Sequence, residues 1–224
     1  MNKYIDAHCH IVSNPSVGAI CNAASVSDWG RVALLQDIAR DIYGAIGVHP
    51  WFIHDLPDGW AQNLEAMLSA NPELLVGEIG LDKHRPDIDT QLSVFTSQLD
   101  IAHNMKRGIC LHCVGAWEHI AHILKTHRNK LPRFILAHAY SGPINLIERM
   151  ASEYNMFFSY GPRNLLNSSR IIATPHPRIL AETDSDTPSG VIDVIGRISD
   201  MLDIDQSKMA DIIYSNTIRM LQDD

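Results

Sequence analysis

The sequence lacks the features that mark membrane and secreted proteins. No apolar run approaches the roughly 20 residues that a membrane-spanning helix requires. The first residues lead directly into a predicted strand, without an apolar signal region. We therefore expect a cytoplasmic protein that has no membrane partner.

Positive charge is also scarce. The 18 Lys and Arg residues are outnumbered by 26 Asp and Glu residues, and the formal net charge at pH 7 is −8. The chain therefore lacks the basic surface typical of proteins that bind duplex nucleic acid. A nucleic-acid substrate is still compatible with this charge, because bound divalent metal ions would add positive charge where phosphate must lie.

Cysteine is rare, and no segment has the composition of a linker. The four cysteines are Cys9, Cys21, Cys110 and Cys113. Cys110 and Cys113 have CxxC spacing, but in a strand residues three apart face opposite sides. We expect buried free thiols, as in a reducing compartment. Without a linker rich in Pro, Gly or Ser, residues 1–224 are predicted to form one domain.

Eight short apolar runs alternate with helical patterns along the chain. The predicted strands are residues 4–8, 18–23, 43–49, 74–79, 109–113, 133–138, 156–160 and 178–183. Helical patterns include residues 60–70, 90–105, 117–125 and 206–221. This alternation favours parallel β/α units. Eight units favour an α/β fold of the closed TIM (β/α)8 barrel type over an open sheet.

Asp6, His8 and His10 lie two residues apart at the first strand. Because side chains alternate along a strand, these three are predicted to face one side, and Ala7 and Cys9 the other. Two imidazoles on one face can chelate a metal ion. Asp6, one step deeper, is predicted to orient a ligand.

The other predicted strands carry similar residues where they end, which is where β/α barrels place their active sites. Six of the eight strand ends carry polar residues that can bind a metal: His8 and His10, His49, Glu78 and Asp82, His112, His138, and Asp184. Histidines scattered over a surface would not gather at one end of a barrel. The strand ends together therefore predict a metal site.

The predicted ligands divide into two sets that share one glutamate. We expect His8, His10, Glu78 and Asp184 to hold one ion. Glu78, His112 and His138 would hold the other. Mg²⁺, Mn²⁺ and Zn²⁺ all accept such ligands in different degrees, and two ions ~4 Å apart can activate a water for phosphoryl displacement. Asp184 is the expected base, and Glu182, deeper on the same face, a supporting residue.

Substrate contacts are predicted around the same rim. His49 either lines the site or is a buried hydrogen-bonded histidine, and Asp82 either joins the site or caps the next element. Lys83 and Arg85 could bind substrate phosphate or simply form an exposed charged turn. Arg163, after the seventh strand, is a weaker candidate for phosphate binding.

Six short motifs in the chain resemble, in order, those of the TatD family of metal-dependent hydrolases and deoxyribonucleases, within the amidohydrolase superfamily. The motifs are residues 6–10 (DAHCH), 47–50 (GVHP), 77–82 (GEIGLD), 111–113 (LHC), 137–142 (AHAYSG) and 182–184 (ETD). The resemblance implies a TIM barrel with metal ligands at His8, His10, Glu78, His112, His138 and Asp184. It also implies phosphodiester cleavage in DNA, often as a 3′-to-5′ exonuclease that uses Mg²⁺ or Mn²⁺.

The chain departs from the family pattern at the substrate-binding rim. Val114 stands where the family usually has an arginine, and residues 184–190 form a short acidic segment where a longer basic loop is usual. The leading hypothesis is thus a two-metal phosphodiesterase acting on DNA ends or a small phosphodiester, expected to be a monomer. Two alternatives are an amidohydrolase or lactonase that acts on a small metabolite, and a non-catalytic binding module.

Overall fold

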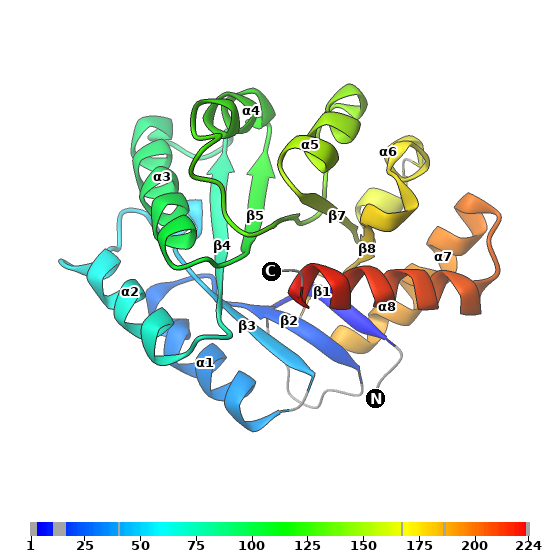
Figure 1. The fold of residues 1–224 in the computed structure, drawn as a ribbon, viewed down its shortest axis with the longest axis horizontal. Helices are drawn as coiled ribbons and strands as arrows, with labels where there is room; N and C mark the ends of the chain where they lie inside the picture. Colours follow the sequence, from blue (N-terminus) through cyan, green and yellow to red (C-terminus); the bar gives the residue numbers. More distant parts are fainter. Residues whose placement is uncertain (1–3, 11–16, 40, 167, 186, 223–224) are drawn as a thin grey trace.

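Eight parallel strands form one sheet that curves into a nearly closed barrel (Figure 1). The computed structural model describes residues 4–10, 17–39, 41–166, 168–185 and 187–222. The strands pair in sequence order: β1 (Ile5–Cys9), β2 (Gly18–Asn22), β3 (Ile42–Ile46), β4 (Leu75–Asp82), β5 (Ile109–Val114), β6 (Ile135–Ala137), β7 (Met156–Tyr160) and β8 (Ile179–Ala181). The predicted TIM barrel is confirmed.

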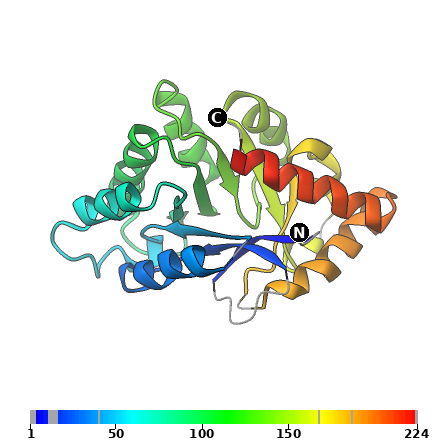
Figure 2. The ribbon, with the colours of Figure 1, turned by 60° about the horizontal axis from the view of Figure 1, so that its bottom comes forward.

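Helices follow the strands and cover the outside of the barrel (Figures 1 and 2). They are α1 (Trp29–Ile38), α2 (Trp60–Ala70), α3 (Ile88–Asn104), α4 (Trp117–Thr126), α5 (Ile147–Glu153), α6 (Ser169–Ala173), α7 (Val191–Leu202) and α8 (Gln206–Gln222). Short 3-10 turns are η1 (Val26–Asp28), η2 (Pro50–Phe52), η3 (Ile144–Leu146), η4 (Asn164–Leu166), η5 (His176–Arg178) and η6 (Pro188–Gly190). No described helix has both the length and the apolar character needed to cross a membrane.

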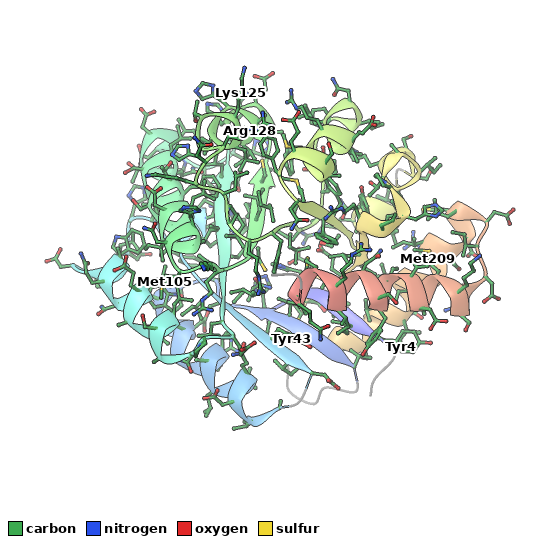
Figure 3. All side chains as sticks on the ribbon, in the orientation of Figure 1. Tyr4, Tyr43, Met105, Lys125, Arg128 and Met209 are labelled. Atoms are coloured by element: carbon green, nitrogen blue, oxygen red, sulfur yellow. The ribbon has the colours of Figure 1, made fainter. Side chains whose placement is uncertain are left out.

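Two apolar layers hold the barrel together. The inner layer fills the barrel with strand side chains: Ala7, Ile20, Ala45, Leu75, Cys110, Leu136, Phe157 and Leu180. Met220 of α8 packs with this layer, so the last turn of α8 covers the end where the strands begin. The outer layer packs the strands against the helices and includes Met209, which Figure 3 labels on α8. The opposite end of the barrel is left for the polar strand ends.

The first strand departs from the predicted alternation. A register shift between Asp6 and Cys9 interrupts the pairing of β1 with β2. Ala7 consequently lies in the inner layer and Cys9 in the outer layer, whereas period 2 predicts that both face one side. The reason is the β-bulge, since an extra residue changes the side to which the following side chains point.

The fourth strand is longer than predicted. Asp82 is the last residue of β4 and is buried, so the prediction that it lies in a loop is wrong. The backbone N–H of Asp82 donates to Oε1 of Gln91 at 2.8 Å, and Nε2 of Gln91 donates to the carbonyl oxygen of Asp82 at 3.1 Å. This pair of bonds to α3 lets the strand continue beyond Glu78. The four cysteines are buried and free, as predicted.

Candidate metal centre

Glu78 lies at the centre of the polar strand ends, with 2% of its surface exposed. One carboxylate oxygen, Oε2, is 3.3 Å from Nε2 of His8 and 3.6 Å from Nε2 of His10. Asp184 completes this side: its Oδ1 lies 3.4 Å from Nε2 of His10 and 3.9 Å from Nε2 of His8. The bulged end of β1 thus brings both imidazoles to one oxygen of Glu78.

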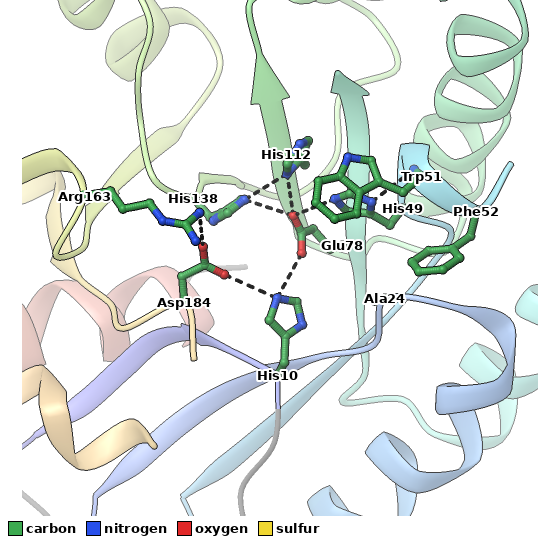
Figure 4. A pocket seen from close by; sticks show the side chains of 10 residues that line it. All are labelled: His10, Ala24, His49, Trp51, Phe52, Glu78, His112, His138, Arg163 and Asp184. Carbon is green, nitrogen blue, oxygen red and sulfur yellow. Dashed lines mark hydrogen bonds and ion pairs between the residues drawn. The ribbon is translucent and has the colours of Figure 1, made fainter. Parts of the chain in front are cut away.

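The other oxygen of Glu78 faces a second set of imidazoles (Figure 4). Oε1 lies 2.7 Å from Nδ1 of His112, 2.9 Å from Nε2 of His138 and 3.3 Å from Nε2 of His49. His112 belongs to β5, and His138 follows β6 directly. Glu78 therefore stands between two ligand sets and presents one oxygen to each.

Both carboxylates of the cluster are ionised. Burial raises the pKa of Glu78, but the charges of His138, His8 and the other imidazoles outweigh it and hold this pKa well below its usual value. Burial also raises the pKa of Asp184, but the hydrogen bond with His10 and the charge of His8 lower it to about 2. The cluster thus offers anionic oxygens next to imidazole nitrogens, a donor set that suits divalent ions.

The loop after β8 directs Asp184 into the cluster. Asp184 has a φ of 51°, a left-handed conformation that residues other than glycine seldom adopt. Its backbone N–H donates to the carbonyl oxygen of His8 at 3.0 Å. The turn at Asp184 is therefore hydrogen-bonded to His8, whose ring also faces the Asp184 carboxylate. Rare backbone conformations of this kind are common at functional sites.

Oxygen atoms that can only accept lie next to Nδ1 of His10 and of His138. Nδ1 of His10 is 3.3 Å from the carbonyl oxygen of Asn22, and Nδ1 of His138 is 3.5 Å from Oε1 of Glu182. Such oxygens only accept, so each Nδ1 carries the proton. With a metal ion between the rings and Glu78, each Nε2 would present its lone pair to that ion. This arrangement, with an oxygen behind the ring, is typical of histidines that bind metals.

His49 has the opposite arrangement. The backbone N–H of Trp51 donates to its Nδ1 at 3.1 Å. Because an N–H can only donate, Nδ1 uses its lone pair and the neutral ring carries its proton on Nε2. His49 therefore presents a hydrogen-bond donor to the cluster, whereas His10 and His138 present lone pairs.

The residues present fit a divalent metal ion. Both ring nitrogens of His8 are buried and lack hydrogen-bond partners among the described residues. An imidazole that is buried without a partner is costly in a folded protein. Three groups of potential ligand atoms each lie within 4.8 Å of one another: His8–His10–Asp184, His8–Glu78–His138 and His49–Glu78–His112. A cation bound among them would give Nε2 of His8 a partner.

Two buried acids support the cluster from behind. Asp6 accepts hydrogen bonds from the backbone N–H of His8 at 3.1 Å and from Thr183. It therefore fixes the backbone of β1 at His8, one of the predicted ligands. Glu182 accepts from the backbone N–H of Ala139 at 3.2 Å and from the hydroxyl of Ser159, and it faces His138.

A cavity of about 250 Å³ opens above the cluster. Its lining includes His10, His49, Glu78, His112, His138, Arg163 and Asp184, together with Ala24, Trp51 and Phe52 (Figure 4). Nη1 of Arg163 lies 3.7 Å from Oδ2 of Asp184. The weaker phosphate candidate of the sequence analysis is thus the arginine that lines the cavity.

Of the other predicted substrate residues, His49 also lines the cavity, whereas Asp82, Lys83 and Arg85 lie outside the lining. Lys83 and Arg85 are exposed beyond the end of β4. Asp82 is buried, and its carboxylate accepts from Nε1 of Trp51 at 2.8 Å and from the backbone N–H of His84 at 2.9 Å. Sequence reasoning did not find Trp51, although it directly follows the GVHP motif that ends in Pro50. The position of Trp51 immediately after a predicted strand end was the available signal.

Comparisons with known proteins bear on the family and on the fold. The chain matches the family described as TatD related DNase over residues 5–222. It is 27% identical over 210 residues to the protein named uncharacterized metal-dependent hydrolase YjjV of Escherichia coli (strain K12), covering 82% of this chain and 79% of YjjV. It is also 27% identical over 176 residues to the 3′-5′ ssDNA/RNA exonuclease TatD of Pectobacterium carotovorum, covering 75% and 67% of the two chains. The crystal structure of YjjV superposes with a TM-score of 0.86 at 24% identity, covering 98% of this chain and 97% of the other, which bears on the fold.

Proposed function

This chain is a metal-dependent hydrolase of the TatD family, and we propose that it hydrolyses phosphodiester bonds at the ends of single-stranded DNA, in the 3′-to-5′ direction. The observation that carries the proposal is the position of Glu78, which presents one oxygen to His8 and His10 and the other to His112 and His138. The exonuclease name of the Pectobacterium relative supports the substrate and the direction.

Two ligand sets would hold two divalent ions, Mg²⁺, Mn²⁺ or Zn²⁺. His8, His10 and Asp184 would hold one together with Oε2 of Glu78. His112 and His138 would hold the other together with Oε1. Bound divalent ions supply an activated water and stabilise the charge that develops on a phosphoryl group. The bridging role of Glu78 predicts that both sets depend on this one carboxylate.

The remaining groups of the cavity can bind and orient a phosphodiester. The carboxylate of Asp184, whose pKa is lowered by His10 and His8, can accept the hydrogen bond of the attacking water and act as the base. His49 presents the proton on Nε2 and can donate it in a hydrogen bond to a phosphoryl oxygen. The guanidinium of Arg163 can pair with another phosphate oxygen. Asp184 would thus act on the attacking water, and His49 and Arg163 on the oxygens of the phosphoryl group.

A second candidate is an amidohydrolase or lactonase that acts on a small metabolite. Two observations favour it: the cavity is about 250 Å³, and the net charge of the chain is −8. Cavities that bind small ligands commonly have volumes of ~300 Å³ or more. At about 250 Å³, this cavity has room for about one nucleotide-sized group. An enzyme that acts on the end of a strand needs no more room than that.

The experiment is hydrolysis of end-labelled single-stranded DNA by the purified protein with Mn²⁺ or Mg²⁺. We expect stepwise shortening from the 3′ end that EDTA abolishes and that the Asp184→Asn variant lacks. Asp58→Asn, at an exposed aspartate before α2, is the matched control and should retain activity. If the wild type binds metal but leaves DNA intact, the proposal is wrong and the small-metabolite candidate takes its place.

A further inference from the structure

We propose that Trp51 and Phe52 form an aromatic platform that stacks the base of the nucleotide at the scissile phosphate. This inference rests on the proposed function and deepens it, because it names the part of the substrate that the cavity recognises. Both residues belong to η2, which follows β3, and both line the cavity above Glu78.

The cavity has two chemically different flanks (Figure 4). Trp51, Phe52 and Ala24 lie on one side of Glu78 in this view. Arg163 lies on the other side, next to Asp184. A nucleotide has the same two parts, a flat aromatic base and an anionic phosphate. With the phosphate at Glu78 and toward Arg163, the base would reach the aromatic flank.

The indole of Trp51 is exposed and yet held in place. Half of its surface, 50%, is exposed. Its backbone N–H is bonded to His49, its Nε1–H donates to the buried Asp82 at 2.8 Å, and the guanidinium of Arg85 lies 4.1 Å from the ring centroid. An exposed aromatic side chain without such anchoring is usually mobile. Anchoring an exposed ring in advance lowers the entropy lost when a flat ligand stacks on it.

The charge of the chain makes stacking the stronger source of affinity. Among the described residues that line the cavity, Arg163 alone carries a permanent positive charge, and the chain as a whole has a net charge of −8. Electrostatic attraction to the nucleic-acid backbone is therefore weak away from the scissile phosphate, where the divalent ions and Arg163 would act. Stacking on an aromatic ring is tolerant of sequence because every base has a π-face. The platform would bind any terminal base without needing a basic groove.

Binding can be measured through the fluorescence of Trp51 in the Mg²⁺-loaded protein. Trp29 and Trp117 are buried, at 2% and 5% exposed, and Trp60 lies outside the cavity lining. The probe is thymidine 5′-monophosphate, and deoxyribose 5-phosphate is the comparator without a base. We expect quenching by the nucleotide alone in the wild type and in the Trp60→Phe control, and none in Trp51→Phe. Equal quenching in Trp51→Phe, or by the sugar phosphate, would overturn the proposal.

Kinetics test the same contact during hydrolysis. Two oligonucleotides are compared, one ending in thymidine and the other in an abasic tetrahydrofuran residue. We expect the wild type to prefer the thymidine end in kcat/KM on the order of tenfold to a hundredfold, the range of one base–aromatic stack. Trp51→Ala should bring this ratio close to unity, whereas Trp51→Phe, which can still stack, should retain most of it.

The outcomes separate the platform from the proposed function. Equal cleavage of the two ends by the wild type would refute the platform and leave the phosphodiesterase standing. Quenching of Trp51 by the nucleotide with no cleavage of either oligonucleotide would refute the proposed reaction and support the platform. A preference for the thymidine end that survives in Trp51→Ala would assign base recognition to another part of the cavity.

Discussion

The carboxylate of Asp6 holds Thr183 by two hydrogen bonds, although 177 residues separate them. Oδ1 accepts from the backbone N–H of Thr183 at 3.0 Å, and Oδ2 accepts from its hydroxyl at 2.5 Å. β1 and β8 are the two ends of the described sheet. Asp6 therefore joins these ends, and in the same place it fixes His8 and the residue that precedes Asp184.

We expect Asp6→Ala to destabilise the protein by about 3 kcal/mol, because unsatisfied buried donors cost ~1–3 kcal/mol each. The donors left without an acceptor are the backbone N–H groups of His8 and Thr183 and the hydroxyl of Thr183. The measurement is urea unfolding of the EDTA-treated protein, which removes any contribution from bound metal.

Two milder variants keep this prediction testable if Asp6→Ala does not fold. Asp6→Asn keeps an acceptor for both backbone groups and should cost less than about 1 kcal/mol. Thr183→Val removes one hydrogen bond and should cost about 1 kcal/mol. If all three variants unfold at the urea concentration of the wild type, Asp6 does not close the barrel.

Replacement of Glu78 should remove metal from both ligand sets. Glu78→Gln keeps the size of the side chain but loses the negative charge that faces imidazoles on both sides. We expect metal content, measured by inductively coupled plasma mass spectrometry, to fall close to zero, whereas Asp184→Asn should lose metal from one set. Glu65→Gln, at an exposed position of α2, is the matched control. A Glu78→Gln protein with full metal content would rule out the bridge.

Much of the fold and of the cluster could be predicted because strands in a parallel barrel are buried on both faces. They appear in sequence as short apolar runs, so their ends could be located closely enough to name the residues there. The prediction that the ligand sets of His8 and of His138 meet at Glu78 needed only the rule that parallel strands end on the same side. The structure brings these three within one cluster.

The features that could not be predicted depend on irregular backbone. The β-bulge in β1 makes Ala7 and Cys9 point to opposite sides. It thereby interrupts the two-residue alternation from which the faces of a strand are predicted. Trp51 and Arg163 follow β3 and β7 in segments without periodicity, so their directions depend on individual hydrogen bonds such as that from Trp51 to Asp82. The position of the proton on His49 could not be predicted either, because it depends on the backbone N–H of a turn.

His49 and His138 should respond differently to substitution, since one presents a proton and the other a lone pair. We expect His49→Ala to retain the bound metal while kcat falls on the order of 10²-fold, as when one donor to a developing oxyanion is removed. His49→Gln, whose amide N–H can donate, should recover part of kcat. His138→Gln should lose metal.

The measurements are metal content and single-turnover rates on the same protein preparations. Loss of metal from His49→Ala would show that this residue is a ligand and that the proton position inferred from Trp51 is wrong. Unchanged kcat would show that His49 does not contact the reacting phosphate.

Arg163 should contribute to substrate binding and little to folding. Its side chain is 89% exposed, and an exposed ion pair with Asp184 is screened by solvent. We expect Arg163→Ala to unfold like the wild type but to lose about tenfold in kcat/KM on single-stranded DNA. Removal of one phosphate contact should also make the negative slope of log(kcat/KM) against log[salt] shallower, by about 0.7. The matched control is Arg128→Ala, at an exposed arginine beyond α4 that Figure 3 labels and that does not line the cavity. An identical salt slope in the wild type and in Arg163→Ala would mean that the substrate phosphate does not reach this guanidinium. Arg163 would then contact only Asp184.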